Sequence, residues 1–416
     1  MEPSKFSNEP WFKLSALSAV YLVWGAIASM NDLLIPYLKS EFELNFSEAM
    51  RIQLVFYMAY FFLSIPCGLL ARRLGYRKGV LTGLLVAIGG CVLMLAASQA
   101  NSFHVVLGAI FVLASGITML QVSANPYATS LGPERTAPSR LTLVQSFHSL
   151  GTTIGPYVGA ILIFSLAASG SHEALSGTPG QGIWRPYALL AAILVFLAIL
   201  FSRLDADPIG QHSTATGFNP LKLARLNPRL LPGTLGIFFY VGAEIAIASF
   251  LVNYLVRPEI AGLDHESAGK LVAVYWGCAL VGRFVGVGLL RVFRPDRLLM
   301  LYAVIACALV ATTINSSGPL ATWSVLLVGF FNSIMFPTIF ALTIRGSAPE
   351  NVPGTSGILC LGIVGGAVIS QAQGILADRI GIQLAFVLPL LCYVYIAFLA
   401  ATFLKPNRAG DARIPI

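Results

Sequence analysis

Twelve apolar stretches, each long enough to cross a lipid bilayer, constrain this chain more than any other feature of its sequence. A helix needs about 20 apolar residues to span roughly 30 Å of hydrocarbon. Of the 416 residues, 56% are hydrophobic and only 11% are charged, and the runs lack the alternation of membrane β-strands. The sequence therefore predicts an all-α membrane protein with twelve transmembrane helices. The predicted spans are 14–38, 49–71, 79–98, 104–130, 140–167, 184–203, 230–256, 267–290, 297–315, 319–345, 354–376 and 383–404.

The twelve spans fall into two sets of six, separated by one polar break. Residues 204–229 are rich in Pro, Gly, Ser and charged side chains. Such a composition is typical of a linker. We therefore predict an N-terminal six-helix bundle over residues 1–203, a cytoplasmic linker over 204–229 and a C-terminal six-helix bundle over 230–416.

The first helices of the two halves also resemble each other. Sliding residues 20–38 onto 237–255 without gaps gives five identities, among them Gly25 with Gly242 and Tyr37 with Tyr254. Parallel repeats of six helices are found in transporters of the major facilitator type. The sequence thus predicts two pseudo-symmetric bundles in the major facilitator fold.

A basic segment between the second and third predicted helices supports this prediction. Residues 68–78 read G-L-L-A-R-R-L-G-Y-R-K and resemble the major facilitator signature, although an arginine replaces its usual acidic residue. The alternative is that the basic run only enforces topology and binds lipid headgroups. The candidates for a gating role are Gly68, Arg72, Arg73, Gly75 and Arg77.

The net charge of +8 reflects membrane topology rather than binding to nucleic acid. Most of the 26 Lys and Arg residues lie in the termini and in the loops that share a side with them. Because basic loops remain in the cytoplasm, this asymmetry predicts that both termini are cytoplasmic. The first apolar run is too long for a cleavable signal peptide, so we expect a multi-pass protein of the cell inner membrane.

Asp32 and Glu244 are the acidic residues inside the predicted spans. An ionised carboxylate at this depth is costly, so such residues face a cavity or a partner and are functional by default. Because they lie on the first helix of each half, both are candidates for coupling transport to a cation. The alternative is a hydrogen-bonded carboxylate that clamps two helices. For Arg283, in the eighth span, we expect a lipid anchor or a structural ion pair rather than a gate.

Amide and aromatic side chains within the spans suit an uncharged ligand rich in hydroxyl groups. Amides hydrogen-bond hydroxyls, and aromatic faces cover the apolar side of a sugar ring. No cluster of basic residues accompanies them, which argues against a phosphorylated substrate. The candidate sugar-binding residues are Gln121, Asn125, Gln145, His148, Tyr240, Glu244, Trp276 and Asn332.

Other chemistry is scarce in this sequence. It contains no G-x-x-x-x-G-K-[ST] phosphate loop, no catalytic triad, and no histidines at metal-ligand spacing. The six cysteines all fall within spans without paired spacing, so we expect them to pack rather than to bond or bind metal. We expect neither an enzyme nor a bound cofactor or metal.

Four segments together resemble the fucose permease and glucose/galactose transporter family of the major facilitator superfamily. The resemblance covers about residues 18 to 375. It implies cation-coupled uptake of a hexose by alternating access between the two halves. The segments are N-D-L-L-I-P at 31–36, L-Q-V-S-A-N-P at 120–126 with L-G-P-E at 131–134, F-F-Y-V-G-A-E at 238–244 with S-F-L-V-N-Y at 249–254, and F-P-T-I-F at 336–340.

The departures from the family pattern favour its glucose/galactose branch. In fucose permeases the acid at the position of Asp32 is taken as a proton site, and a second acid stands where this chain has Gln121. Gln145 matches the family's helix-five glutamine, whereas His148 stands where an asparagine is usual. The resemblance therefore implies a glucose- or galactose-like substrate and a coupling route that differs from that of the fucose permeases.

The predicted function is uptake of a hexose coupled to an inward cation gradient, with H⁺ as the first choice. Na⁺ coupling and an uncoupled uniporter remain open, and a drug or metabolite exporter is a more distant alternative. A membrane sensor ranks last because the chain carries no soluble output domain. The expected partners are a sugar, the lipid bilayer and the co-transported H⁺ or Na⁺, with no nucleic acid, and the protein is expected to be monomeric.

Overall fold

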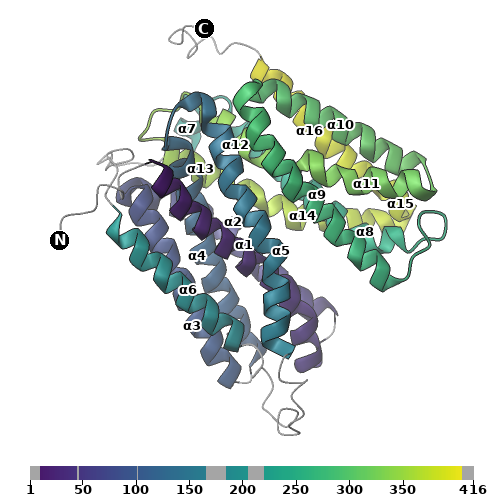
Figure 1. The fold of residues 1–416 in the computed structure, drawn as a ribbon, viewed down its shortest axis with the longest axis horizontal. Coiled ribbons are helices and arrows are strands. Elements are labelled where there is room, and N and C mark those ends of the chain that lie inside the picture. The colour runs from purple at the N-terminus through teal and green to yellow at the C-terminus, as the bar shows by residue number, and fades with distance from the viewer. Residues whose placement is uncertain (1–9, 45, 101, 165–183, 205–219, 405–416) are drawn as a thin grey trace. The chain divides into compact units, whose positions relative to one another are not determined.

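The structure is a computed structural model that describes residues 10–44, 46–100, 102–164, 184–204 and 220–404. Within these ranges every regular element is a helix (Figure 1). Eleven segments of the described chain are long and apolar enough to cross a membrane. Helix α5 (Ala137–Phe164) occupies the position of the remaining predicted span. The prediction of an all-helical membrane protein is therefore confirmed.

The helices group into two compact units. Unit 1 comprises Met1–Leu131 and Val144–Thr216, and unit 2 comprises Gly132–Leu143 and Gly217–Ile416. Most of the predicted linker, residues 205–219, lies outside the described residues. Besides α5, the helices of unit 1 are α1 (Pro10–Glu41), α2 (Phe46–Leu74), α3 (Tyr76–Ala100), α4 (Phe103–Ser130) and α6 (Trp184–Arg203). Those of unit 2 are η2 (Glu134–Thr136), α7 (Pro220–Leu226), α8 (Leu230–Leu255), α9 (His265–Val292), α10 (Pro295–Asn315), α11 (Gly318–Asn332), α12 (Met335–Ile344), α13 (Val352–Leu361), η5 (Gly362–Val364), α14 (Gly365–Ile380), α15 (Ile382–Ala385) and α16 (Val387–Leu404).

Residues Gly132–Leu143, which include the start of α5, pack with unit 2, whereas the rest of that helix packs with unit 1. The Ser139 hydroxyl donates to the carbonyl oxygen of Val287 over 2.8 Å. The Glu134 carboxylate lies 3.5 Å from the Arg345 guanidinium. Residues 132–143, which the sequence assigned to the N-terminal bundle, are thus held by contacts with α9 and with the residue that follows α12.

Local sequence signals mark where several helices begin. The Asp264 carboxylate accepts the backbone N–H of Ser267 at the start of α9, over 2.9 Å. This bond satisfies one of the N–H groups that the first turn of a helix leaves unpaired. Helix α10 begins with Pro295, because proline lacks the N–H that would be unpaired at that position and its φ suits the first turn.

Small residues allow the helices to approach closely. Helices α3 and α4 lie side by side in Figure 1, and they share an extensive contact. A Cβ atom built on Gly116 would lie 2.5 Å from the backbone nitrogen of Ala87, and one built on Gly90 would lie 2.6 Å from the backbone of Leu113. Since burial of apolar surface does not drive helix association in lipid, such backbone proximity provides the packing energy.

The two units repeat one such crossing at equivalent helices. In unit 1, a Cβ atom on Gly25 of α1 would collide with the carbonyl oxygen of His148 on α5. In unit 2, a Cβ atom on Gly365 of α14 would collide with the carbonyl oxygen of Phe238 on α8. Gly242, which the sequence comparison pairs with Gly25, also lies at the crossing of α8 with α14. The similarity of the first helices thus extends to how each packs.

The tenth and eleventh predicted spans are not uninterrupted helices. The tenth is divided into α11 and α12 around Ser333 and Ile334. Pro337 lies four residues after Ser333 and has no N–H to donate to the carbonyl oxygen of that residue. The eleventh narrows to a 3₁₀ turn at Gly362–Val364, where Gly362 and Gly365 touch α8.

Candidate functional site

Unit 1 contains a connected group of polar and aromatic side chains, which we call the N-terminal polar cluster. Gln121 and Asn125 lie one turn apart on α4, whose residues 116–129 are all buried. The Tyr60 hydroxyl of α2 donates to Gln121 Oε1 over 2.9 Å, and the Tyr21 hydroxyl of α1 donates to Asn125 Oδ1. The members of the cluster are Tyr21, Trp24, Tyr60, Gln121, Asn125, Gln145 and His148.

Aromatic contacts extend the cluster from α1 to α5. The rings of Tyr21 and Trp24 have centroids 5.0 Å apart. The Trp24 ring meets His148 edge-on, with centroids 4.8 Å apart and planes at 72°. Gln145 is buried one turn before His148 on α5. Four of the predicted sugar-binding residues thus come from two helices whose side chains are linked through α1 and α2.

Asn125 is the member of this cluster with an unused donor. Its side chain is fully buried, and its Nδ2 atom makes no hydrogen bond within the described residues. A buried amide that lacks one partner costs free energy until a ligand or water supplies it. One buried amide donor is therefore without an acceptor among the described residues, close to the rings of Tyr21 and Trp24.

Unit 2 contains a second group, the C-terminal polar cluster of Tyr240, Glu244, Tyr275, Arg283 and Asn332. The Tyr240 hydroxyl donates to Glu244 Oε1 over 2.8 Å, one turn along α8. Asn332 Nδ2 of α11 donates to the Tyr275 hydroxyl of α9 over 2.9 Å, and that hydroxyl lies 3.4 Å from the backbone carbonyl oxygen of Glu244. Asn332 Oδ1 has no hydrogen-bond partner in the described chain.

Arg283 supplies the positive charge of the C-terminal polar cluster. Its Nη2 atom lies 3.9 Å from Glu244 Oε1, and the two residues are 8% and 7% exposed, respectively. A buried carboxylate is costly unless a cation and hydrogen bonds compensate it, and here Arg283 and Tyr240 do so. The expectation of a lipid anchor is wrong, because the guanidinium reaches Glu244 inside the unit. The structural ion pair is the role that the geometry shows.

The remaining sequence candidates lie at separate places. Asp32 is on α1, but its side chain lies outside the described residues. Trp276 is partly exposed and packs edge-on against Tyr275, with centroids 5.3 Å apart. Among the described residues, no group of three or more His, Cys, Asp or Glu side chains could hold a metal ion.

The predicted gating segment spans the junction of α2 and α3. Gly68 is buried on α2, and Arg72 and Arg73 form the last turn of that helix. Gly75 has φ = 79°, a left-handed conformation that favours glycine. Arg77 Nη1 donates to the carbonyl oxygen of Leu204, which follows α6. This contact gives Arg77 a role in capping α6.

Sequence reasoning did not predict which tyrosines connect the predicted polar residues. Tyr21, Tyr60 and Tyr275 bond Asn125, Gln121 and Asn332, respectively. Tyr393 of α16 lies near the same group in unit 2. A single sequence shows aromatic residues in apolar helices, but it carries no signal for which hydroxyl meets which amide across two helices.

Two units of membrane-spanning helices, each enclosing a polar cluster, define a membrane carrier. The family model of the Major Facilitator Superfamily matches residues 17–369. The glucose/galactose transporter of Brucella abortus is 46% identical over 387 residues, which cover 93% of each chain. The L-fucose-proton symporter of Escherichia coli K12 is 33% identical, and the match covers 93% of this chain and 92% of the symporter.

A solved structure agrees with these sequence relationships. A crystal structure of the E. coli fucose:proton symporter superposes with a TM-score of 0.85 at 30% sequence identity, covering 96% of this chain and all of that one. The chain belongs to the Major Facilitator Superfamily, in the group formed by the fucose permeases and the glucose/galactose transporters. The predicted fold and family are therefore confirmed.

Proposed function

We propose that this protein is a secondary active transporter that takes up a hexose of the glucose or galactose type. Coupling is to an inward cation gradient, with protons as the first choice. The observation that carries the proposal is the N-terminal polar cluster. In this cluster the buried Asn125 Nδ2 atom has no acceptor among the described residues and lies close to aromatic rings. The names of the relatives from B. abortus and E. coli support sugar as the substrate, and the second name supports protons as the coupling ion.

In this proposal each polar cluster offers hydrogen-bonding groups to a sugar. Gln121, Asn125, Gln145 and His148 hydrogen-bond hydroxyl groups in the N-terminal polar cluster, and Trp24 covers an apolar face of the ring. In the C-terminal polar cluster, the Glu244 carboxylate and Asn332 Oδ1 accept from hydroxyls, beside Tyr240 and Trp276. An uncharged, hydroxyl-rich substrate suits this set because it requires both donors and acceptors.

We assign ion loading to Asp32 and sugar binding to Glu244. Glu244 already faces a fixed cation, Arg283, whereas Asp32 carries the role that the family resemblance implies. Asp32→Asn is expected to abolish accumulation against a gradient while counterflow of sugar continues, because counterflow needs binding without net ion movement. Accumulation at the wild-type level in this variant would exclude Asp32 as the coupling site.

We further propose a monomeric protein in the cell inner membrane, with both termini in the cytoplasm. The basic residues of the 68–78 segment support this orientation. A cysteine introduced at Ser316, between α10 and α11, should react with an impermeant thiol reagent added outside intact cells. The same cysteine should be protected if the orientation is reversed.

The decisive experiment is uptake of labelled glucose and galactose into proteoliposomes. Uptake is measured under an imposed inward proton gradient, and then under a sodium gradient alone. Proton-dependent accumulation supports the proposal, and sodium-dependent accumulation changes the ion but keeps the substrate. Equilibration without accumulation indicates a uniporter. No sugar uptake overturns the substrate class, and protection of cells against toxic compounds would then favour an exporter.

A further inference from the structure

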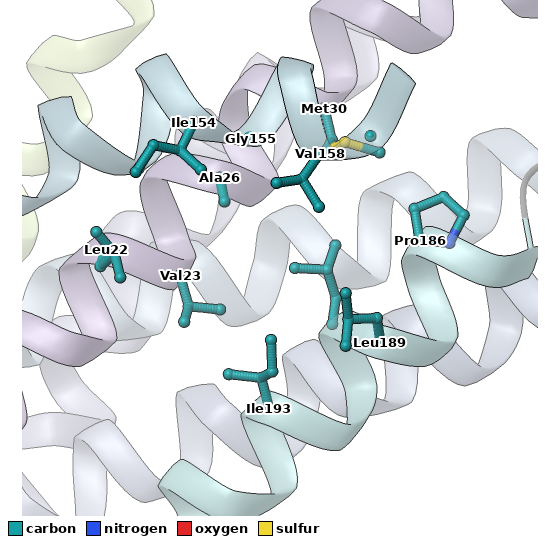
Figure 2. A pocket seen from close by; sticks show the side chains of 13 residues that line it. Leu22, Val23, Ala26, Met30, Ile154, Gly155, Val158, Pro186, Leu189 and Ile193 are labelled. Atoms are coloured by element: carbon teal, nitrogen blue, oxygen red, sulfur yellow. The ribbon is translucent and has the colours of Figure 1, made fainter. Parts of the chain in front are cut away.

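Unit 1 contains an apolar cavity that the proposed sugar chemistry does not use. It has a volume of about 170 Å³ and lies between α1, α5 and α6 (Figure 2). Thirteen residues line it, and none of them has a polar side chain. Val23 and Met30 of α1 form its inner wall, and Ile193 is among the residues that α6 contributes. A sugar would find no hydrogen-bonding side chain in this cavity.

The cavity adjoins the outer surface of unit 1. Ile154 and Val158 of α5 and Leu189 of α6 line it, and all three are also exposed. Helix α6 is long and apolar enough to cross a membrane over Arg185–Arg203. Leu189 lies within this segment, so the cavity opens on the surface of a helix that can cross the bilayer.

The chemistry of the lining selects an apolar occupant. Water needs two to four polar partners to remain in a cavity, and this lining provides no polar side chain. The segment between α5 and α6 is an unsuitable occupant of the cavity, because residues 168–182 are mainly Ser, Gly, Thr, Ala and charged or polar residues. An empty space beside liquid hydrocarbon leaves its lining without dispersion contacts, so an acyl chain is the occupant that fits.

We propose that this cavity binds one acyl chain of a membrane phospholipid. The chain enters between α5 and α6 and reaches the face of α1 formed by Val23 and Met30. This site lies beside the crossing of α1 with α5, where Gly25 touches the backbone of His148. A bound chain therefore supports the pair of helices that carries Trp24 and His148, without touching the sugar-binding side chains.

A photoactivatable lipid can test the site directly. The protein is reconstituted with phosphatidylcholine that carries a diazirine on one acyl chain, irradiated, and digested with trypsin. Val23 is only 8% exposed, so a lipid that stays on the outer surface labels α5 and α6 but not this residue. We expect labelling within residues 14–39, between Lys13 and Lys39, at positions that line the cavity.

Two matched substitutions separate the cavity from the general lipid surface. Val158→Phe fills the mouth of the cavity, whereas Val195→Phe is the same change on α6 outside it; the two valines are 38% and 42% exposed. Labelling of residues 14–39 should fall at least fivefold in Val158→Phe and stay unchanged in Val195→Phe. Ile193→Phe is the substitute from α6 if Val158→Phe does not fold.

Either of two results would overturn the proposal. One is the absence of label from residues 14–39 in the wild-type protein, which would mean that the cavity stays empty or is covered by another part of the chain. The other is equal labelling in Val158→Phe and Val195→Phe. Because the readout is lipid contact and not transport, it is independent of whether the protein carries a sugar.

Discussion

Arg283→Gln would leave the Glu244 carboxylate buried without its cation. The two groups are 3.9 Å apart at 8% and 7% exposure, and breaking a buried pair by removing one partner typically costs about 3–5 kcal/mol. We expect a loss of this size in the free energy of unfolding. In contrast, Glu244→Gln combined with Arg283→Gln removes both charges, and the loss should shrink to about 1 kcal/mol or less because no unpaired charge remains.

Equilibrium unfolding in mixed detergent micelles measures this effect as a double-mutant cycle. Lys270→Gln on the same helix is the control, because its pair with Glu266 is solvent-exposed and should contribute less than about 0.5 kcal/mol. Arg283→Lys keeps the charge and should recover part of the stability. The reasoning is refuted if Arg283→Gln costs no more than the control, or if the double variant loses as much as the two single variants together. The double variant should also bind sugar more weakly, since Glu244 is the proposed acceptor.

Two other predictions concern the amide of unit 1 and a helix cap of unit 2. Asn125→Ala should raise the KM for sugar uptake about fivefold or more, because a substrate hydrogen bond of about 1–3 kcal/mol is lost. Asn125→Ala also removes the amide oxygen that accepts from the Tyr21 hydroxyl, which should lower the stability of the protein. Adding Tyr21→Phe should restore this stability but should not restore the KM. Recovery of the KM would contradict the assignment of Asn125 to sugar binding. Hydrogen bonds from the Ser267 backbone N–H and hydroxyl lower the pKa of Asp264 below its ordinary value of 3.8. A lowered pKa means that the cap stabilises the fold at neutral pH and is lost as pH falls through that pKa, so the melting temperatures of wild type and Asp264→Ala should differ at pH 7 and converge in acid.

The sequence predicted the architecture because membrane-spanning helices can be recognised from the length and apolar composition of a segment. It also named Gln121 and Asn125 as candidates, and their spacing of four residues puts them on one face of α4. The interruption near Ser333 had a readable signal in Pro337. The pair of Glu244 with Arg283 had no such signal, because the two residues are 39 positions apart in sequence and lie on different helices. The apolar periodicity of one helix does not show which side chain of another helix faces it. Tyr275 was visible as an aromatic residue, but its bond to Asn332 depends on how α9 crosses α11.

The glycine crossings also limit how this protein can evolve. Where α1 meets α5 and where α8 meets α14, backbone lies directly on backbone, so neither pair can slide or rotate without a collision. The positions of Trp24 and His148 are therefore fixed in relation to each other by main-chain contact. In the proposed transporter, we therefore expect sugar preference to change through exchange of single side chains, such as the histidine at 148, rather than through the shift of a helix.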